Sequence, residues 1–305
     1  MSKLIFLGTS EFALPILKKI HESKNEIISV ITKPPSRSKR GQRIQISPVH
    51  DFAKKKNLSV KTPAKIENEE NFFKDLEFDL GIVVAYGQII PEKILKYGKF
   101  GFINVHASIL PKYRGAAPIQ RSIINSDKIT GVSIMKINRG LDAGPVCNIY
   151  KVQINETDNF ISLATKLSDI AANYINQNIN LIVSNKVKFL EQDHKVSTYA
   201  KKINKSEGKI NWNDNAKYIE AKIRALYPSP GIWFNFENER YKILKAKLSL
   251  KSGKPGLVLD DNLTIGCGIS SLEILDLQRQ GKKPQKKIDF LLGSKIKKGV
   301  ILDNG

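Results

Sequence analysis

The chain has 305 residues, of which 41% are hydrophobic, and no apolar run comes near the roughly 18 residues that a membrane-spanning helix needs. Its two cysteines, Cys147 and Cys267, lie far apart in the sequence, so we expect neither a disulfide framework nor a metal site. The absence of a disulfide framework fits the cytoplasm, where we expect the protein. Lys and Arg number 50 against 29 Asp and Glu, and this net charge of +21 favours a polyanionic partner such as nucleic acid over a general enrichment in lysine.

The N-terminal part of the chain alternates short apolar runs with helical segments. The runs that read as buried strands are at residues 3–7, 26–32, 79–85 and 102–105. This alternation predicts an α/β fold with a Rossmann-like, doubly wound parallel sheet. Gly8 ends the first run but no further glycine follows at once, so the turn lacks the fingerprint for a pyrophosphate. That argues against a dinucleotide-dependent oxidoreductase.

A basic segment follows the second predicted strand. Residues 31–50 have no regular apolar period, contain several prolines and carry no acidic residue. They therefore predict an exposed loop that is neither helix nor strand. Contact with phosphates explains five cations without an anion better than a solvated insertion does. These cations are Lys33, Arg37, Lys39, Arg40 and Arg43.

The second half of the chain changes character near residue 189. A strand at 131–137, a glycine-rich loop at 138–145 and a long amphipathic helix at 158–184 complete a predicted catalytic domain, residues 1–188. Polar residues 189–206 read as a linker. Short strands at regular spacing in 207–305 predict a small β-barrel of the OB type. Residues 201–305 carry a net +10 and the first 200 carry +11, so positive charge is denser in this second domain.

Three polar residues form the candidate catalytic group. Asn104 and His106 are two residues apart on one strand, so their side chains share a face, and Asp142 follows 36 residues later. No nucleophile elbow occurs in the sequence, so acyl transfer would proceed without a covalent enzyme intermediate. Amide and imidazole donors would stabilise the oxyanion, and a carboxylate–histidine pair would organise the proton transfers.

The motifs around these residues resemble those of the formyltransferases that use 10-formyltetrahydrofolate. The motifs are L-G-T-S-E-F-A at 7–13, A-Y-G-Q-I-I-P at 85–91, I-N-V-H at 103–106, S-I-L-P at 108–111, R-G-A-A-P-I-Q at 114–120 and G-L-D-A-G at 140–144. The resemblance covers the whole length and implies catalytic roles for Asn104, His106 and Asp142. Ala107 replaces the usual glycine, which a methyl group permits unless that position needs φ > 0.

The resemblance also implies how the substrates bind. For the folate cosubstrate it implies a loop of Ser108, Ile109, Leu110 and Pro111, with Tyr86 and Gly87 on the pterin side. The basic segment and the barrel resemble the members that formylate the α-amino group of initiator methionyl-tRNA. In those members Arg40-Gly41 would match a tRNA-contacting Arg-Gly. The expected tRNA-binding residues are Lys33, Arg37, Lys39, Arg40, Arg43, Lys282 and Lys283.

Two alternatives share these features in part. A formyltransferase acting on a sugar-nucleotide or purine-precursor amine would keep the catalytic group but would not need a basic barrel. A catalytically idle RNA-binding protein would not need intact Asn104, His106 and Asp142. We therefore expect an enzyme that acts on tRNA, uses no metal and works as a monomer.

Overall fold

The structure is a computed structural model that describes residues 1–38 and 43–303. It divides into two compact units, each made of more than one stretch of chain. Unit 1 comprises Met1–Pro118, Ile129–Gln153 and Ala164–Ala200, and unit 2 comprises Ile119–Lys128, Ile154–Leu163 and Lys201–Gly305. The units do not meet at one point in the sequence, so the domain boundaries at 188 and 207 and the linker at 189–206 stay predictions.

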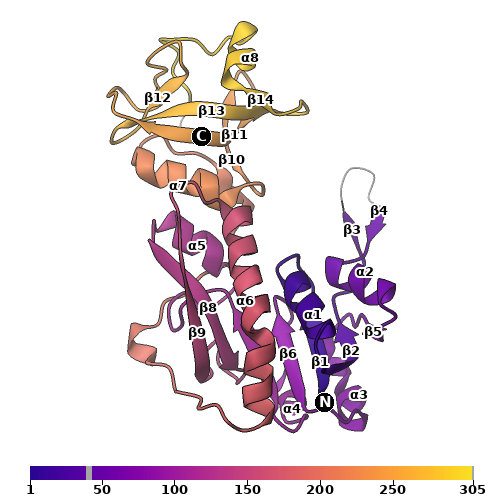
Figure 1. Ribbon diagram of the computed structural model, residues 1–305. Helices are drawn as coiled ribbons and strands as arrows, with labels where there is room; N and C mark the ends of the chain where they lie inside the picture. Colours follow the sequence, from indigo (N-terminus) through magenta and orange to yellow (C-terminus); the bar gives the residue numbers. More distant parts are fainter. Residues whose placement is uncertain (39–42, 304–305) are drawn as a thin grey trace. The chain divides into compact units, whose positions relative to one another are not determined.

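Unit 1 is built on a seven-stranded sheet with the strand order β5-β2-β1-β6-β7-β8-β9 (Figure 1). Its strands are β1 (Lys3–Gly8), β2 (Glu26–Ile31), β5 (Val60–Lys61), β6 (Leu80–Val84), β7 (Phe102–His106), β8 (Ile129–Lys136) and β9 (Val146–Gln153). The first five in spatial order are parallel, which confirms the predicted Rossmann-like sheet. β8 pairs antiparallel with β7, and β9 pairs antiparallel with β8. The carboxyl ends of β1, β6 and β7 therefore share one edge, where ligands bind in α/β folds.

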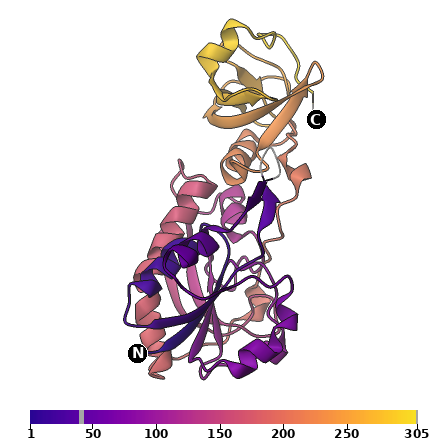
Figure 2. The same cartoon turned by 90° about the vertical axis from the view of Figure 1, so that its right-hand side faces the viewer.

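Helices cover this sheet. Figures 1 and 2 show α1 (Ala13–His21) and α6 (Phe160–Val183) side by side, held by hydrogen bonds from Ser168 Oγ to the Phe12 carbonyl (2.7 Å) and from Asn176 Nδ2 to the Lys19 carbonyl (3.0 Å). The bounds of α6 agree with the long helix predicted at 158–184. No helix among residues 1–38 and 43–303 is both long and apolar enough to cross a membrane. The other helices of this unit are α2 (Pro48–Lys55), α3 (Glu70–Asp75) and α4 (Glu92–Leu95), with 3₁₀ turns η1 (Ile66–Asn68) and η2 (His194–Val196).

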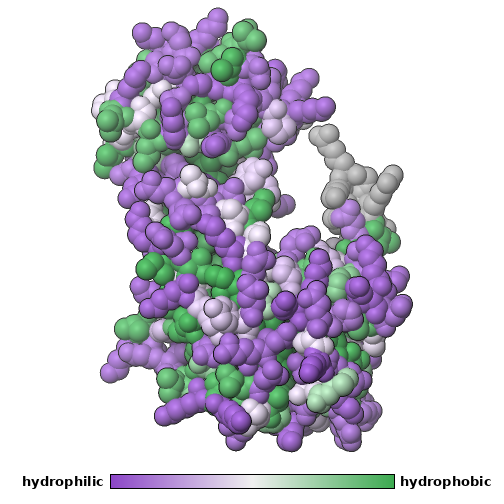
Figure 3. Space-filling view, viewed as in Figure 1, coloured by the Kyte–Doolittle hydropathy of each residue, from purple (hydrophilic) through white to green (hydrophobic). Residues whose placement is uncertain are grey.

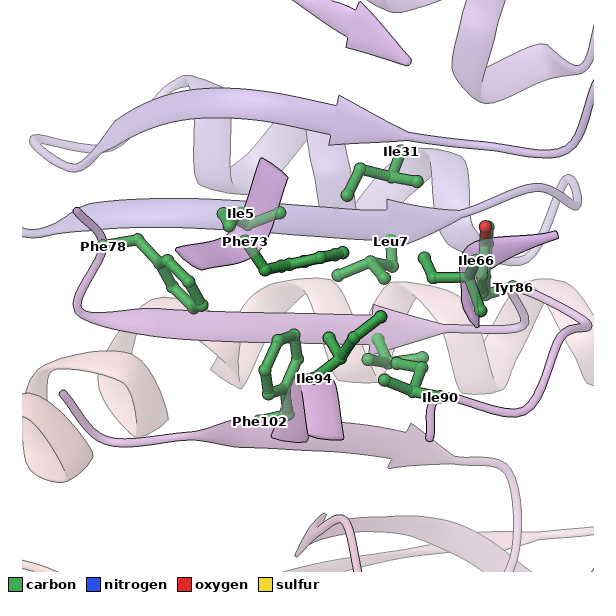
Figure 4. Packing of buried hydrophobic residues seen from close by; sticks show 11 residues of the cluster. Ile5, Leu7, Ile31, Ile66, Phe73, Phe78, Tyr86, Ile90, Ile94 and Phe102 are labelled. Carbon is green, nitrogen blue, oxygen red and sulfur yellow. The ribbon is translucent and has the colours of Figure 1, made fainter. Parts of the chain in front are cut away.

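A cluster of buried apolar side chains fills the space between the sheet and the short helices α3 and α4 (Figure 4). The rings of Phe73, Phe78 and Phe102 meet edge to face, with centroids 5.6 to 6.5 Å apart. Gly81 on β6 leaves room for them, because a Cβ atom there would stand 2.2 Å from the Phe102 ring. Each fully buried side chain of this size stabilises the fold by about 1.5–3 kcal/mol, so β6 and β7 pack on a well-filled core.

The prediction that residues 31–50 are neither helix nor strand was wrong. β3 (Ser36–Ser38) pairs antiparallel with β4 (Arg43–Gln45), with Ser36 opposite Gln45, and α2 begins at Pro48 with Ser47 as its N-cap. The hairpin escaped the sequence pattern because its strands have three residues each and no apolar alternation. The predicted contacts Lys39 and Arg40 lie outside the described residues.

Unit 2 holds a five-stranded antiparallel sheet in the order β10-β11-β13-β12, with β14 paired to β13. A small β-barrel is predicted for this part, and the sheet is a curled half-barrel; the register shifts in β11 opposite β13, around Lys245, favour this curl. Trp212 is fully buried beside Phe234, which stacks on Tyr241 at 5.5 Å. Its elements are β10 (Ile232–Phe236), β11 (Glu239–Ser249), β12 (Thr264–Gly266), β13 (Ser271–Arg279), β14 (Gln285–Lys286), α5 (Pro118–Ile124), α7 (Ala216–Leu226), α8 (Lys287–Leu292) and the 3₁₀ turn η3 (Lys205–Gly208).

Side chains join the separate stretches of unit 2. Arg121 Nη1 donates to Glu207 Oε2 at 2.6 Å, and this guanidinium holds the pKa of Glu207 below its usual range. Arg224 Nη1 donates to the Asp158 carbonyl at 2.8 Å. Both arginines are mostly shielded from solvent, with side-chain exposures of 20% and 18%. The segments 119–128 and 154–163 are therefore tied to the C-terminal stretch by charge-assisted hydrogen bonds.

Candidate active site

The end of β7 places two of the predicted catalytic residues. Asn104 pairs with Val83 on β6 and with Met135 on β8, so neighbours on both sides hold its backbone. His106 pairs with Ser133 and is 6% exposed. The two side chains share one face of the strand, as the spacing predicts. Ala107 lies outside the left-handed backbone region, so its methyl group is compatible with this geometry.

The loop between β8 and β9 brings the third residue to them. Asp142 Oδ1 accepts from Asn104 Nδ2 at 3.1 Å, and Oδ2 accepts from the Gly115 backbone N–H at 2.8 Å. Oδ2 also lies 3.6 Å from His106 Nδ1. The structure thus brings together all three residues that the sequence suggested. Asp142 is held at φ 46°, a left-handed conformation that costs a non-glycine residue about 1 kcal/mol or more.

The other nitrogen of the imidazole faces a backbone carbonyl. His106 Nε2 is 2.9 Å from the Tyr113 oxygen. Because a carbonyl oxygen only accepts, Nε2 carries the hydrogen in this arrangement. Both ring nitrogens therefore face oxygen atoms, Nε2 at hydrogen-bond distance and Nδ1 slightly beyond it. The ring orientation is set by the loop around Tyr113 on one side and by Asp142 on the other.

The residues predicted for folate form a tightly held loop. Ser108 is fully buried, and its Oγ donates to the Lys112 carbonyl at 2.6 Å. Ser133 Oγ donates to the Ser108 carbonyl at 2.7 Å and accepts from the Leu110 N–H at 3.1 Å. Leu110 packs into an apolar cluster and is 4% exposed, so it could meet a ligand only through its backbone. Ile109 and Pro111, by contrast, are half-buried.

The Tyr86-Gly87 turn lies at the end of β6. The Tyr86 side chain is 1% exposed within the cluster of Figure 4, and burial raises its pKa to about 12. Its ring therefore belongs to the core, and only its backbone, whose carbonyl accepts from Thr9 Oγ1 at 2.9 Å, could line a pterin site. Gly87 has φ +80°, and a Cβ atom there would stand 2.6 Å from Lys33 Nζ. Lys33, predicted for tRNA, thus lies against a residue predicted for folate.

The remaining predicted tRNA contacts are spread over both units. Arg37 lies on β3 and Arg43 on β4. Lys282 and Lys283 follow β13, are exposed, and form no ion pair with an acidic side chain in the part of the chain that is described. Figure 3 shows hydrophilic residues over most of the face in view, with hydrophobic residues scattered among them. Exposed, unpaired cations of this kind suit phosphate contacts.

Sequence reasoning missed two buried side chains next to the catalytic group. Arg114 is 2% exposed, and its Nε and Nη2 donate to Gln192 Oε1 at 3.1 and 2.8 Å. Gln192 Nε2 donates to the carbonyls of Asp142 and Gly144 at 2.9 and 2.7 Å. Arg114 stood in a recognisable motif, but nothing in the predicted linker singled out Gln192.

The thiols are unsuited to act as nucleophiles. Burial raises the pKa of Cys147 to about 11 and that of Cys267 to about 12, so neither forms a thiolate near neutral pH. Among residues 1–38 and 43–303, no three His, Cys, Asp or Glu side chains gather where they could hold a metal ion.

An amide, an imidazole and a carboxylate meet at the end of a strand in a doubly wound sheet. Enzymes that transfer an acyl group between two substrates use side chains of these types. The family described as "Formyl transferase" matches residues 2–179, and "Formyl transferase, C-terminal domain" matches residues 202–295. The chain belongs to the formyl transferase family.

Known proteins are similar over the full length. The methionyl-tRNA formyltransferase of Pelagibacter ubique (strain HTCC1062) is 52% identical over 306 residues, which cover 99% of each chain. That of Paramagnetospirillum magneticum (strain AMB-1) is 39% identical and covers 98% of this chain and 99% of its own. The crystal structure of the sugar 3N-formyl transferase WlaRD, with dTDP and 5-N-formyl-THF, is 23% identical with a TM-score of 0.71. It covers 93% of this chain and 99% of its own, and supports the fold alone.

Proposed function

We propose that the chain transfers the formyl group of 10-formyltetrahydrofolate to the α-amino group of initiator methionyl-tRNA. The full-length similarity to methionyl-tRNA formyltransferases supports the tRNA substrate, and the family supports a folate-type formyl donor. The single observation that carries the chemistry is the meeting of Asn104, His106 and Asp142 at the end of β7. The steps proposed below require no metal ion.

The reaction begins when the amine lone pair attacks the formyl carbon. The carbon becomes tetrahedral and its oxygen gains negative charge, which hydrogen-bond donors stabilise. The amide nitrogen of Asn104 carries two hydrogens, and one is bound to Asp142 Oδ1, so the second is free for the formyl oxygen. His106 lies on the same face of the strand, and its Nε2–H, which faces the Tyr113 carbonyl in this structure, would turn to the formyl oxygen as a further donor.

Collapse of this tetrahedral centre breaks the bond to the folate nitrogen. The attacking amine must lose a proton and the departing folate nitrogen must gain one, so the proton count balances. We assign this proton transfer to His106, because an imidazole can both accept and release a proton and the Asp142 carboxylate beside Nδ1 would stabilise the protonated ring. In this mechanism Asp142 orients both Asn104 and His106 through its two carboxylate oxygens.

The tRNA would be held by the basic residues outside the cluster. Lys282 and Lys283 of unit 2 and the cations of segment 31–50 carry charge that phosphates neutralise. Binding should therefore weaken steeply as salt is raised.

The direct test is formylation of aminoacylated initiator tRNA by the full-length chain with 10-formyltetrahydrofolate. A free sugar-nucleotide amine and uncharged tRNA serve as controls. Formyl transfer to methionyl-tRNA but not to the amino sugar is the expected result. Transfer to the amino sugar alone would replace the proposed acceptor, and transfer to neither would contradict the proposal.

A further inference from the structure

A stretch that neither family match covers is built into the candidate active site. The matches end at residue 179 and resume at residue 202. Between them, the Thr198 carbonyl accepts from the Arg114 backbone N–H at 2.9 Å, and the Ala200 N–H donates to the Arg114 carbonyl at 2.7 Å. Thr198 Oγ1 also accepts from the Tyr113 N–H at 2.9 Å. Residues 192–200 therefore run alongside the loop that contacts His106.

One buried side chain in this stretch contacts both loops that orient the imidazole. Gln192 Oε1 binds the Arg114 guanidinium, and Gln192 Nε2 binds the carbonyls of Asp142 and Gly144. Residues on either side of Arg114 reach the catalytic group: the Tyr113 carbonyl contacts His106 Nε2, and the Gly115 N–H donates to Asp142 Oδ2. The Gln192 amide thus links the loop that contacts His106 Nε2 to the loop that places Asp142 beside His106 Nδ1.

The choice of an amide is informative. Arg114 is 2% exposed, and a carboxylate would be the stronger partner for a buried guanidinium. Instead, Arg114 pairs with the neutral Gln192 and, through Nη2, with His194 Nδ1 at 3.2 Å. A carboxylate at 192 would have no hydrogens for the Asp142 and Gly144 carbonyls. The residue present is therefore the one that can satisfy Arg114 and hold the Asp142 loop together.

We propose that Gln192 and Arg114 are positioning residues for formyl transfer, which set Asp142 and the His106 ring in their working geometry. This inference rests on the proposed function, because it acts through the roles assigned there to Asp142 and His106. A displacement of about 1 Å at such a site can lower the rate by about 10²-fold. The alternative is that the pair only stabilises the fold.

The test substitution is Gln192→Glu, which keeps acceptors for Arg114 but loses both N–H bonds to the Asp142 loop. We expect kcat for methionyl-tRNA formylation to fall about 10- to 100-fold, with KM for tRNA and for folate nearly unchanged. Thermal melting would check that the variant is folded. Arg114→Lys, which keeps the charge but loses the fork that binds Gln192, should show the same loss in kcat and serves if Gln192→Glu does not fold. Wild-type kcat in a folded variant of either kind would overturn the inference.

A matched control is Asn178→Asp in the same unit. Asn178 is fully buried, and its Nδ2 donates to Tyr150 Oη at 2.8 Å and to the Tyr174 carbonyl at 2.9 Å. The Asn178→Asp variant therefore loses two N–H hydrogen bonds, as Gln192→Glu does, but at a site away from the catalytic group. We expect a lower melting temperature but a kcat within about twofold of wild type. A loss in kcat equal to that of Gln192→Glu would mean that any buried amide produces the effect.

A double substitution separates this inference from the function on which it rests. If Gln192 acts through Asp142, Gln192→Glu should cost little further activity in an Asp142→Asn background. The full loss of kcat in that background would contradict action through Asp142. Wild-type activity of Asp142→Asn alone would instead contradict the proposed mechanism, whatever Gln192→Glu does.

Discussion

The two regions that the proposed reaction needs hold their polar groups in different ways. His106 is buried, Asn104 and Asp142 are half-buried, and the three contact one another or the adjoining backbone. Lys282 and Lys283 are exposed and pair with no acidic side chain within the described residues. A developing oxyanion needs donors in place before the reaction, whereas phosphates respond to charge over a wider range of positions. Substitutions in the cluster should therefore change kcat, and those among the cations should change tRNA binding.

The largest expected effect is that of Asn104→Ala. The variant loses the proposed donor to the formyl oxygen and the hydrogen bond to Asp142 Oδ1. Loss of one such donor typically lowers kcat by about 10²- to 10³-fold, with little change in KM. Single-turnover formylation with saturating tRNA measures this. An effect confined to KM for tRNA would break the comparison, because it would place Asn104 among the binding residues.

Gly144→Ala should disturb the same cluster indirectly. A Cβ atom at Gly144 would stand 2.0 Å from the Lys136 carbonyl oxygen, so the loop that carries Asp142 has to move. We expect kcat to fall about 10- to 100-fold and stability to fall by about 1–3 kcal/mol.

The control is Gly293→Ala, because nothing lies within 4 Å of a Cβ atom there. Urea unfolding and steady-state kinetics of both variants provide the measurement. Unchanged kcat in Gly144→Ala would show that the Asp142 loop tolerates displacement.

Substitution of Lys282 and Lys283 should change KM for tRNA and leave kcat nearly unchanged. Replacing Lys282 and Lys283 together by Gln removes two exposed charges without changing the buried cluster. If both contact phosphates, KM for tRNA should rise about tenfold at moderate salt, and the slope of log K against log salt should fall by about 2. Kinetics over a salt series, with folate saturating, measure both. A fall in kcat with an unchanged slope would contradict the assignment of these lysines to tRNA.

The smallest effect on activity is expected from Asp260→Asn. Burial by itself would raise the pKa of Asp260, but hydrogen bonds from Lys251 and Thr264 outweigh it and lower the pKa to about 2. Since this lies below the ordinary value of 3.8, the carboxylate stabilises the fold above about pH 4, and the contribution is lost as the pH falls through about 2. We expect a loss of about 2 kcal/mol at pH 7 with kcat unchanged.

Denaturant unfolding at pH 7 and at decreasing pH measures this, with the exposed neighbour substitution Asp261→Asn as control. The difference between wild type and Asp260→Asn should shrink as the pH falls from about 4. A difference that is constant with pH would mean that packing, not charge, is lost.

The parts of the fold and site that follow a local pattern could be predicted from the sequence. Strand alternation put Asn104 and His106 on one face, and the buried runs identified β1, β2, β6 and β7. The hairpin of β3 and β4 could not be foreseen, because strands this short carry no period. The Tyr86-Gly87 loop is predicted to line the pterin side, but no local pattern shows that the Tyr86 side chain lies in the core, since its neighbours there come from distant segments.

Gln192 is the clearest case of a residue without a local signal. Its partners Arg114, Asp142 and Gly144 are 78, 50 and 48 residues away. A stretch that reads as a polar linker gave no indication of this, because only the folded chain brings these groups together. The three catalytic candidates could be named from their types and spacing, whereas the residues that hold them in place could not.

Because unit 2 is made of three stretches of chain, its structure limits how chimeras between members of this family can be built. A C-terminal domain transplanted at residue 201 would arrive without residues 119–128 and 154–163. Glu207 would then lack Arg121, and Arg224 would lack the Asp158 carbonyl. Unless the recipient supplied equivalent partners, Glu207 would keep only its contact with the Asn204 N–H and Arg224 only its contact with Glu220 among the described residues. A working chimera therefore has to exchange three stretches of chain, not one.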